Sequence, residues 1–349
     1  MTPGAIIVVD ESPSATGHNN SPTAVDHPGT MAGCPLVCLD VLGKSVLERT
    51  IDKIRQSRIG AISVVGDATW LRVLSMQRQS AASTAEHSSV NTWLAAIEAF
   101  NTYAKNGVQS IIVIRLRAYM DFNLEDILQC HREQRFPATQ IADQHGNLDF
   151  WVLDGARVEA TDLPSLEWAS FGGAAGMRNG SAIATYLLRG YVNRLRHPRD
   201  FRQLVMDSFR GQNQLLPAGR EIQRGVWAEE SAQIHRRAQL IGPVYVGRRA
   251  KLREDTLVAR YSNVECDSEV DCGTAVQDSS ILPNTYVGSW LDISHAVIQQ
   301  SHIAHLARNV VMEISDRNVL RATVESPSRP LHEASSSMTL EGLAFAPSE

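Results

Sequence analysis

The sequence predicts an α/β domain with a mostly parallel, Rossmann-like sheet, followed by a left-handed parallel β-helix. Two observations lead to this fold class: strands alternate with helices through the first part of the chain, and a six-residue repeat occupies the second part. The chain has 349 residues, of which 43% are hydrophobic and 20% are charged. At roughly 150 residues per domain, this length accommodates about two domains with apolar cores.

The α/β part is indicated by short aliphatic runs separated by helical patterns. Buried strands are expected at Ala5–Val9, Ala61–Val65 and Ser110–Ile114. A hairpin is expected next, because the turn sequence Gln144-His145-Gly146-Asn147 separates strands at Ala138–Ala142 and Leu148–Leu153. The first helix begins at the capping box of Ser45 and Glu48 and ends at Gly60. The other helices are expected at Asn91–Asn106, with Leu94, Ile97 and Ala104 on the apolar face, at Leu124–Arg135 behind the N-cap Asn123, and over residues 178–211 with a break at Pro198.

The β-helix is indicated by nine consecutive positions, six residues apart, that all hold Ile, Leu or Val. They are Ile234, Leu240, Val246, Leu252, Val258, Val264, Val270, Val276 and Leu282. A small or β-branched residue stands two positions before each of them. This is the pattern of hexapeptide repeats, in which three short strands close a triangular coil and the aliphatic residues fill it. The register then slips by three and resumes at Leu291, Val297 and Ile303.

These patterns divide the chain. Residues 1–225 are expected to form the α/β domain, with a loop-rich stretch at 10–33 and an insertion at 75–89. Residues 226–324 would form the β-helix and its cap, in which 302–324 covers the last coil or docks on a second subunit. Residues 325–349 are rich in Ser and Pro and are expected to be a disordered tail.

Charge and cysteine content exclude several function classes. The net charge of −5 and the pI near 6.1 give no electrostatic basis for binding nucleic acid or an anionic membrane. No apolar run approaches the ~20 residues of a membrane span, and the N-terminus lacks a signal-peptide pattern. Five cysteines, an odd number, fit reduced thiols. We therefore expect a cytoplasmic protein.

Several segments together resemble sugar-nucleotide pyrophosphorylases, which join a sugar 1-phosphate to a nucleoside triphosphate. The segment 35–48, PLVCLDVLGKSVLE, resembles the family's "KPLLPVLGKPLLE", and Ile59–Asp67 resembles the "VVGD" strand that follows it. The stretch 123–139 resembles "DL..LL..HRE…AT". Gly225-Val226-Trp227 and the stretch 242–247 resemble the entry to the β-helix in mannose-1-phosphate guanylyltransferases. The resemblance covers roughly residues 5–310 and implies a phosphorylated sugar or sugar nucleotide as ligand.

The catalytic motifs of this family are degenerate here. The family's first strand leads into a glycine-rich loop that cradles the triphosphate, but here Asp10 and Glu11 follow the strand and Pro13 removes an amide donor. The lysine expected before Pro35 is Cys34. The "W.DIGTP" stretch with the second metal-binding aspartate has no counterpart in residues 215–225. The resemblance therefore leaves no catalytic residue to name.

Two arginines are the candidate ligand-binding residues. Counting back seven positions from Leu124 places Arg117 where the family has its metal-binding aspartate, and a guanidinium cannot ligate Mg²⁺. Arg115 and Arg117 follow a buried strand, at the edge where open α/β sheets bind ligands. Side chains alternate along a strand, so both could face one ligand and hold a phosphate without metal. The alternative is that both are surface arginines.

Three functions of different classes remain open. The first is a sugar nucleotidyltransferase-family protein with lost or weakened catalysis that binds a sugar nucleotide or a partner. The second is an active nucleotidyltransferase, the one case that would need Mg²⁺. The third is a hexapeptide acyltransferase with His295 or His302 as general base. A zinc site of His295, His302 and His305 is a further possibility, against which solvated surface histidines are the simpler interpretation. The expected assembly is a homo-oligomer or a complex with a related nucleotidyltransferase subunit.

Overall fold

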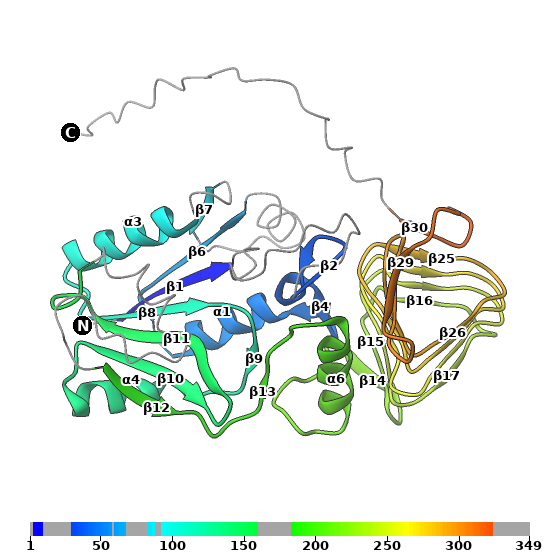
Figure 1. Cartoon of the computed structure of the whole chain (residues 1–349). Helices are drawn as coiled ribbons and strands as arrows, with labels where there is room; N and C mark the ends of the chain where they lie inside the picture. The colour runs from blue at the N-terminus through cyan, green and yellow to red at the C-terminus, as the bar shows by residue number, and fades with distance from the viewer. Residues whose placement is uncertain are drawn as a thin grey trace, which may run out of the picture.

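A computed structural model describes residues 3–9, 29–57, 59–67, 83–87, 92–159 and 183–323. The degenerate loop after the first strand, most of the stretch at 75–89, and the expected tail at 325–349 lie outside the described residues. Within them, the chain forms a seven-stranded α/β sheet followed by three stacks of short strands (Figure 1). No helix in this described part combines the length and the apolar character that crossing a bilayer requires.

The α/β sheet has the strand order β12-β10-β11-β8-β1-β6-β7. Only β11 runs antiparallel to its neighbours, so the sheet is mostly parallel, as expected. The strands are β1 (Gly4–Val9), β6 (Ala61–Asp67), β7 (Ser83–His87), β8 (Ser110–Arg115), β10 (Ala138–Asp143), β11 (Gly146–Asp154) and β12 (Ile183–Leu187). The strand β7 lies inside the expected insertion 75–89, which therefore adds an edge strand to the sheet.

Helices cover both faces of this sheet. The helices α1 (Val46–Gln56) and α4 (Leu124–Gln134) pack on the face to which Ile112 and Ile114 of β8 point. The helix α3 (Thr92–Lys105) packs on the opposite face, with Ile111 and Val113. Both predicted caps are present: Ser45 and Glu48 form the reciprocal capping box of α1, and Asn123 accepts a hydrogen bond from the Glu125 amide at the start of α4.

The predicted apolar face of α3 is confirmed at Ile97 and Ala104, which pack against the sheet, and is wrong at Leu94, which is 56% exposed. The buried residues of the helix are Thr92, Ala95, Ala96, Phe100 and Tyr103. The two alanines allow α3 to approach the sheet closely, and the aromatic rings then fill the space beyond them. The buried face of α3 therefore consists mainly of small and aromatic side chains and does not include Leu94.

The helix predicted over residues 178–211 is also wrong in its first half. Ile183–Leu187 is β12, which pairs in parallel with β10, and β13 (Val192–Asn193) pairs with β9 (Tyr119–Met120). Gly190 lies between β12 and β13 in the chain. Glycine is required at this position because a Cβ atom would lie 1.8 Å from the Asp121 carbonyl oxygen. The helix α6 (Pro198–Phe209) begins at the predicted break, with Asp200 accepting from the amides of Arg196 and His197.

Short elements connect β1 to α1 and complete the α/β part. They are β2 (Thr30–Met31), β3 (Cys34–Pro35), the 3₁₀ turn η1 (Leu36–Cys38), β4 (Asp40–Val41) and β5 (Lys44–Ser45). The pairs β2–β3 and β4–β5 are antiparallel. The hairpin of β4 and β5 brings the chain to the capping box of α1.

The three stacks of strands follow the hexapeptide pattern. Over residues 226–299 the chain visits three sheets in rotation, and strands one turn apart pair in parallel, which makes the topology compatible with the expected β-helix. One sheet contains β14 (Arg220–Gln223), β15 (Val226–Ala228), β18 (Val244–Val246), β21 (Asn263–Val264), β24 (Ser280–Ile281), β27 (Ala296–Gln299), β28 (His302–His305) and β29 (Val310–Glu313). The second contains β16 (Gln233–Ile234), β19 (Lys251–Leu252), β22 (Glu269–Val270), β25 (Thr285–Val287) and β30 (Leu320–Ala322). The third contains β17 (Gln239–Ile241), β20 (Leu257–Ala259), β23 (Ala275–Gln277) and β26 (Asp292–Ser294).

We call residues 226–299 the coil. Val246 pairs with Val264, and both side chains are fully buried in the coil core, as the repeat predicts. The register prediction beyond Val276 is wrong, because Val264 pairs with Ile281 and not with Leu282. The turn before Ile281 is one residue shorter, so Leu282 points outward and packs against the α/β part instead. The later core positions are accordingly Val287, Ile293 and Ile298.

The segment after the coil covers two of its strand edges. The strand β28 pairs antiparallel with β27, and β30 pairs antiparallel with β25. At the start of the coil, β14 pairs antiparallel with β15, so the sheet begins before residue 226, where the domain boundary was expected. Antiparallel pairing at both ends satisfies backbone groups that parallel stacking leaves open.

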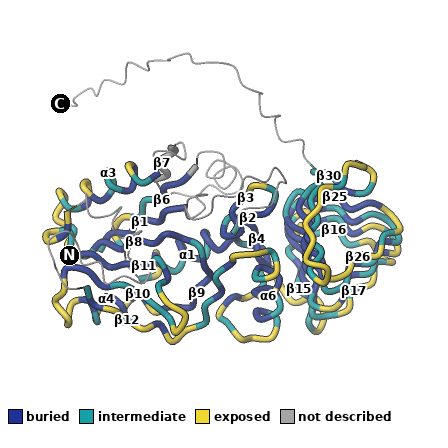
Figure 2. Tube along the Cα trace, in the orientation of Figure 1, coloured by how far each residue is buried: buried dark blue, intermediate teal, exposed yellow. Residues whose placement is uncertain are grey.

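One outer face of the coil packs directly against the α/β part. Tyr245 and Leu282 of the coil belong to the same buried cluster as Phe201 and Leu204 of α6. Figure 2 shows buried segments on both sides of this junction. The two parts therefore share a continuous core, which positions the coil beside β4, β5 and α1.

Candidate functional site

The carboxyl ends of the parallel strands meet at one edge of the α/β sheet. The strands β6 and β8 pair with β1 on opposite sides, and the chain reaches β6 before it returns to β8. The direction of strand order therefore reverses between β1 and β8. Open α/β sheets bind their ligands in the crevice at such a reversal, beyond the carboxyl ends of the strands.

Arg115 is the last residue of β8 and pairs with Val8 of β1, so it lies directly at this reversal. Its side chain is 6% exposed, and its guanidinium carbon lies 5.9 Å from the ring centre of Trp93 in α3. The interpretation of Arg115 as a surface arginine is therefore wrong. A planar, weakly hydrated guanidinium tolerates such a position better than an ammonium group does.

Arg117 lies two residues beyond the end of β8 and is half-buried. The Leu116 amide between the two arginines donates to the Val8 carbonyl oxygen at 2.8 Å, and the Leu116 side chain is buried in the cluster on the α1 side of the sheet. The segment is thus held at the edge of β1. A shared ligand for Arg115 and Arg117 stays a prediction.

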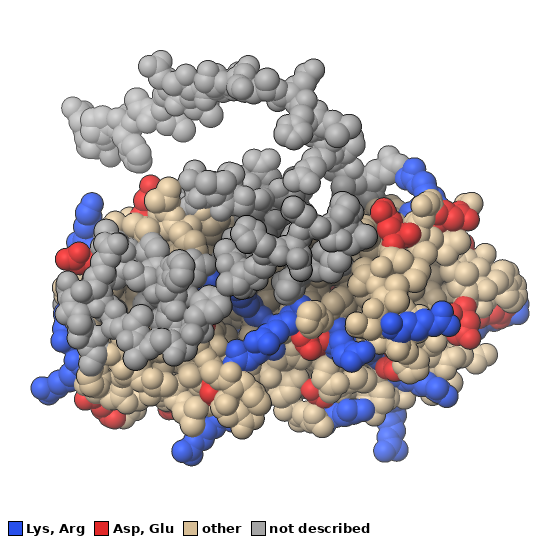
Figure 3. All heavy atoms as spheres, viewed as in Figure 1, with Lys and Arg blue, Asp and Glu red and all other residues tan. Residues whose placement is uncertain are grey.

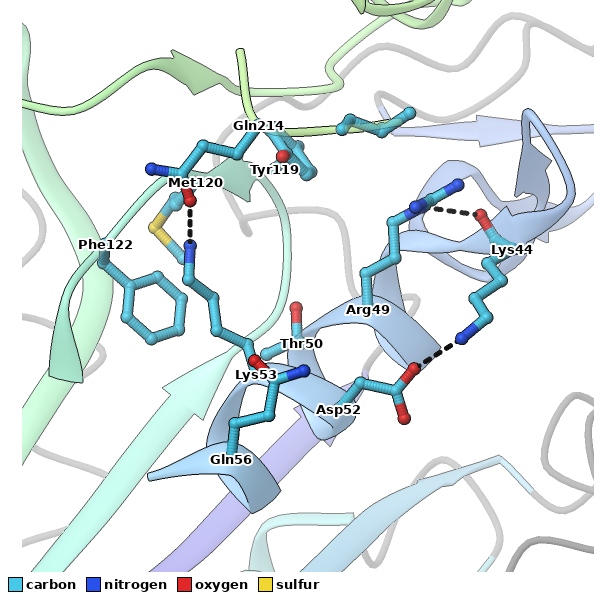
Figure 4. A pocket seen from close by; sticks show the side chains of 11 residues that line it. Lys44, Arg49, Thr50, Asp52, Lys53, Gln56, Tyr119, Met120, Phe122 and Gln214 are labelled. Carbon is cyan, nitrogen blue, oxygen red and sulfur yellow. Dashed lines mark hydrogen bonds and ion pairs between the residues drawn. The ribbon is translucent and has the colours of Figure 1, made fainter. Parts of the chain in front are cut away.

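A second candidate site is a hollow that sequence reasoning missed. It has a volume of about 260 Å³ and lies between α1, β9 and the chain around Gln214 (Figure 4). Lys44, Arg49 and Lys53 line it together with one carboxylate, that of Asp52. Figure 3 shows Lys and Arg side chains gathered over α1 and the adjacent end of the coil. The signal in the sequence was the three- and four-residue spacing of Arg49, Asp52, Lys53 and Gln56, which places them on one face of α1.

The groups behind this hollow are already hydrogen-bonded. Asp121 accepts hydrogen bonds from the Tyr119 hydroxyl at 2.8 Å and from the backbone amide of Gln214 at 2.9 Å. Lys53 Nζ lies 3.9 Å from Asp121 Oδ1 and donates to Gln214 Oε1 at 3.3 Å. Burial lowers the pKa of Lys53, and Asp121 acts in the opposite direction. Figure 4 shows Lys53 extending between the Phe122 ring and Gln214.

The junction with the coil holds a buried carboxylate that sequence reasoning also missed. Glu265 is fully buried, and its two oxygens accept from the amides of Leu42 at 2.8 Å and Gly43 at 3.0 Å, in the turn between β4 and β5. Burial raises the pKa of Glu265 to about 8, and the neighbouring Asp40 carboxylate adds to this shift. Arg49 is held at the same turn, donating to carbonyl oxygens of residues 41, 42 and 44. The coil thereby fixes the segment that leads into α1.

The histidines singled out in the sequence do not form a metal site. No group of three or more His, Cys, Asp or Glu side chains that could hold a metal ion occurs among the described residues. His295 Nδ1 instead contacts a carboxylate oxygen of Asp278, and Asp278 also accepts a hydrogen bond from Arg202 Nη2 at 2.8 Å. Arg202 is 1% exposed and also donates to the Tyr261 carbonyl oxygen at 2.7 Å. This chain of contacts links α6 to the coil.

Comparisons with known proteins do not establish a family. No family model and no curated protein matches the chain. A solved structure of HddC from Yersinia pseudotuberculosis complexed with GMP-PN aligns at 13% identity and a TM-score of 0.40, covering 58% of this chain and 97% of that one. A second structure of HddC from the same organism aligns at 12% identity with the same TM-score and coverage.

Proposed function

We propose that this protein is a sugar nucleotidyltransferase-like protein with lost or weakened catalysis, which binds a phosphorylated sugar or sugar nucleotide at the edge of its α/β sheet. The observation that carries the proposal is the position of Arg115 and Arg117 at the reversal of strand order between β1 and β8. The sequence resemblance to the pyrophosphorylases supports the same ligand class. We include in this proposal that the α/β domain ends at residue 225 and that the second part of the chain is a left-handed β-helix of hexapeptide repeats.

The donor set at this edge suits an anion and not Mg²⁺. Mg²⁺ requires oxygen ligands, and Arg117 stands where the resembled family has a carboxylate. Arg115 adds a second guanidinium at the same strand end. Two guanidinium groups can hold phosphate oxygens through charge-assisted hydrogen bonds, which places fixed positive charge where the family uses a metal. We therefore derive no catalytic step through Mg²⁺.

Turnover separates this proposal from an active enzyme. Purified protein would be incubated with pyrophosphate and a panel of NDP-sugars, with and without Mg²⁺, and the products followed by mass spectrometry. The proposal expects NDP-sugars to raise the melting temperature without being converted to NTP and sugar 1-phosphate. Rapid Mg²⁺-dependent conversion would establish a nucleotidyltransferase with a rebuilt site and contradict the proposed loss of catalysis.

One contact favours a second candidate, the hexapeptide acyltransferase. Asp278 holds Nδ1 of His295, and the His295 side chain is 54% exposed, so its Nε2 atom can act as a base toward solvent. Titration with acetyl-CoA tests this candidate. Saturable binding that His295→Asn removes would favour acyl transfer, whereas no binding would leave His295 as a link between the coil and Asp278.

A further inference from the structure

The hollow between α1 and β9 presents a lysine whose charge is only weakly neutralised. Both carboxylate oxygens of Asp121 already accept hydrogen bonds from Tyr119 and the Gln214 amide, and Lys53 Nζ approaches this carboxylate only to 3.9 Å. Its hydrogen bond goes to the neutral side chain of Gln214, at 3.3 Å. An additional anion beside Lys53 Nζ would therefore stabilise the charge of this partly buried ammonium group.

Two further cations frame the same hollow. Arg49 is held in place by its Nε and Nη2 atoms, and no described residue accepts a hydrogen bond from its Nη1 atom. Lys44 forms an exposed ion pair with Asp52 at 2.8 Å. The lining thus carries three cations against one carboxylate, and the Asp121 carboxylate behind the hollow leaves a surplus of one positive charge. Exposed pairs such as Lys44–Asp52 contribute little energy, so an incoming anion can replace them.

One wall of the hollow is apolar and aromatic. Phe122, Met120 and Leu215 line it, and Lys53 Nζ lies 4.8 Å from the centre of the Phe122 ring. These three side chains are largely buried, so they offer only a small apolar edge to the hollow; part of a sugar or nucleoside ring can contact this edge, whereas an inorganic anion gains nothing from it. A volume of about 260 Å³ is sufficient for part or all of a small phosphate ester.

We propose that this hollow is a second binding site, which takes an organic phosphate monoester, with the phosphate on Lys53 and the ring against the edge of Phe122, while Arg49 and Lys44 add positive charge at the other end of the hollow. The site lies on the α1 face of the sheet, whereas Arg115 packs against α3 on the opposite face. It therefore does not depend on the proposed function of the strand edge. The two sites are expected to bind independently of one another.

Calorimetric titration of the full chain in EDTA tests the site with inorganic phosphate, ribose 5-phosphate and guanosine 5′-monophosphate as probes. Lys53→Met is expected to weaken binding of the two organic phosphates at this site about ten- to hundredfold, the loss typical of a charge-assisted contact. Lys53→Arg retains the charge and should recover most of the affinity. Lys105→Met, at the exposed end of α3 on the other face, is the matched control and should bind like the wild type.

The outcomes separate this proposal from the strand-edge site. A site that persists in Arg117→Ala and is lost in Lys53→Met supports the hollow as a second site, even where the strand edge binds nothing. Unchanged titrations of Lys53→Met, or loss of all binding in Arg117→Ala, would overturn it. Inorganic phosphate that binds as tightly as the organic phosphates would overturn the assignment of the ring to Phe122. Gln214→Ala, which removes the partner of Lys53 without removing a charge, provides a second variant should Lys53→Met fold poorly.

Discussion

The coil and the α/β sheet bury their side chains through different kinds of contact. This difference explains which of their buried residues the sequence pattern predicts. In the coil, each core residue contacts its equivalents one turn away, so one six-residue period predicts the apolar core positions from Val246 to Val276. In the α/β part, the burial of a residue depends on partners far away in the sequence, as Phe100 of α3 against β1 illustrates. Periodicity therefore describes the coil well and the α/β part only in outline.

The largest expected effect comes from placing a charge in the coil core. Val264 is fully buried between Val246 and Ile281, so Val264→Asp should lower the free energy of unfolding by about 4 kcal/mol or more. Denaturant unfolding followed by circular dichroism measures this loss. The control is Val310→Asp on the exposed β29, which should change stability by no more than about 0.5 kcal/mol. Similar losses for the two variants would show that the repeat does not build the core.

A pH-dependent effect is expected at the junction of the two parts. The pKa of Glu265 is raised to about 8, so folding favours its protonated form; this stabilisation is fully present below the ordinary pKa of 4.5 and is lost as the pH rises through about 8. Stability should therefore fall between about pH 4.5 and pH 8, by at most about 1.4 kcal/mol per pH unit from this group, and level off above pH 8. Glu265→Gln should flatten that part of the profile. An unchanged profile in Glu265→Gln would assign the pH dependence to other groups.

The smallest expected effect concerns the start of α1. Ser45→Ala removes the capping box with Glu48 and should cost about 1 kcal/mol of stability. Ser57→Ala at the other end of α1, where the hydroxyl donates to the Lys53 carbonyl oxygen, is the matched control and should cost less than about 0.5 kcal/mol. Thermal unfolding compares the two. Equal costs would mean that the capping box, although read correctly from the sequence, does not stabilise this helix.

The errors of sequence reasoning arise where contacts are non-local. A one-residue shortening before Ile281 turns Leu282 toward the α/β part, and no local signal marks that turn. Ile183–Leu187 forms a strand because β10 offers it an edge. The capping box at Ser45 and the strand leading to Arg115 were predictable, because their causes lie within a few residues. The hollow at Lys53 was not, because α1 meets Phe122 and Gln214 only in the folded chain.

The central claim is that fixed positive charge at the end of β8 binds a phosphorylated ligand without metal. Calorimetric titration of wild type and Arg117→Ala with an NDP-sugar, in EDTA and in Mg²⁺, tests it most directly, with Arg132→Ala at the opposite edge of the sheet as control. The account predicts equal affinity in EDTA and Mg²⁺, a loss of about 1.5–3 kcal/mol in Arg117→Ala, and no loss in Arg132→Ala. Binding that requires Mg²⁺, or that is unchanged in Arg117→Ala, would contradict it.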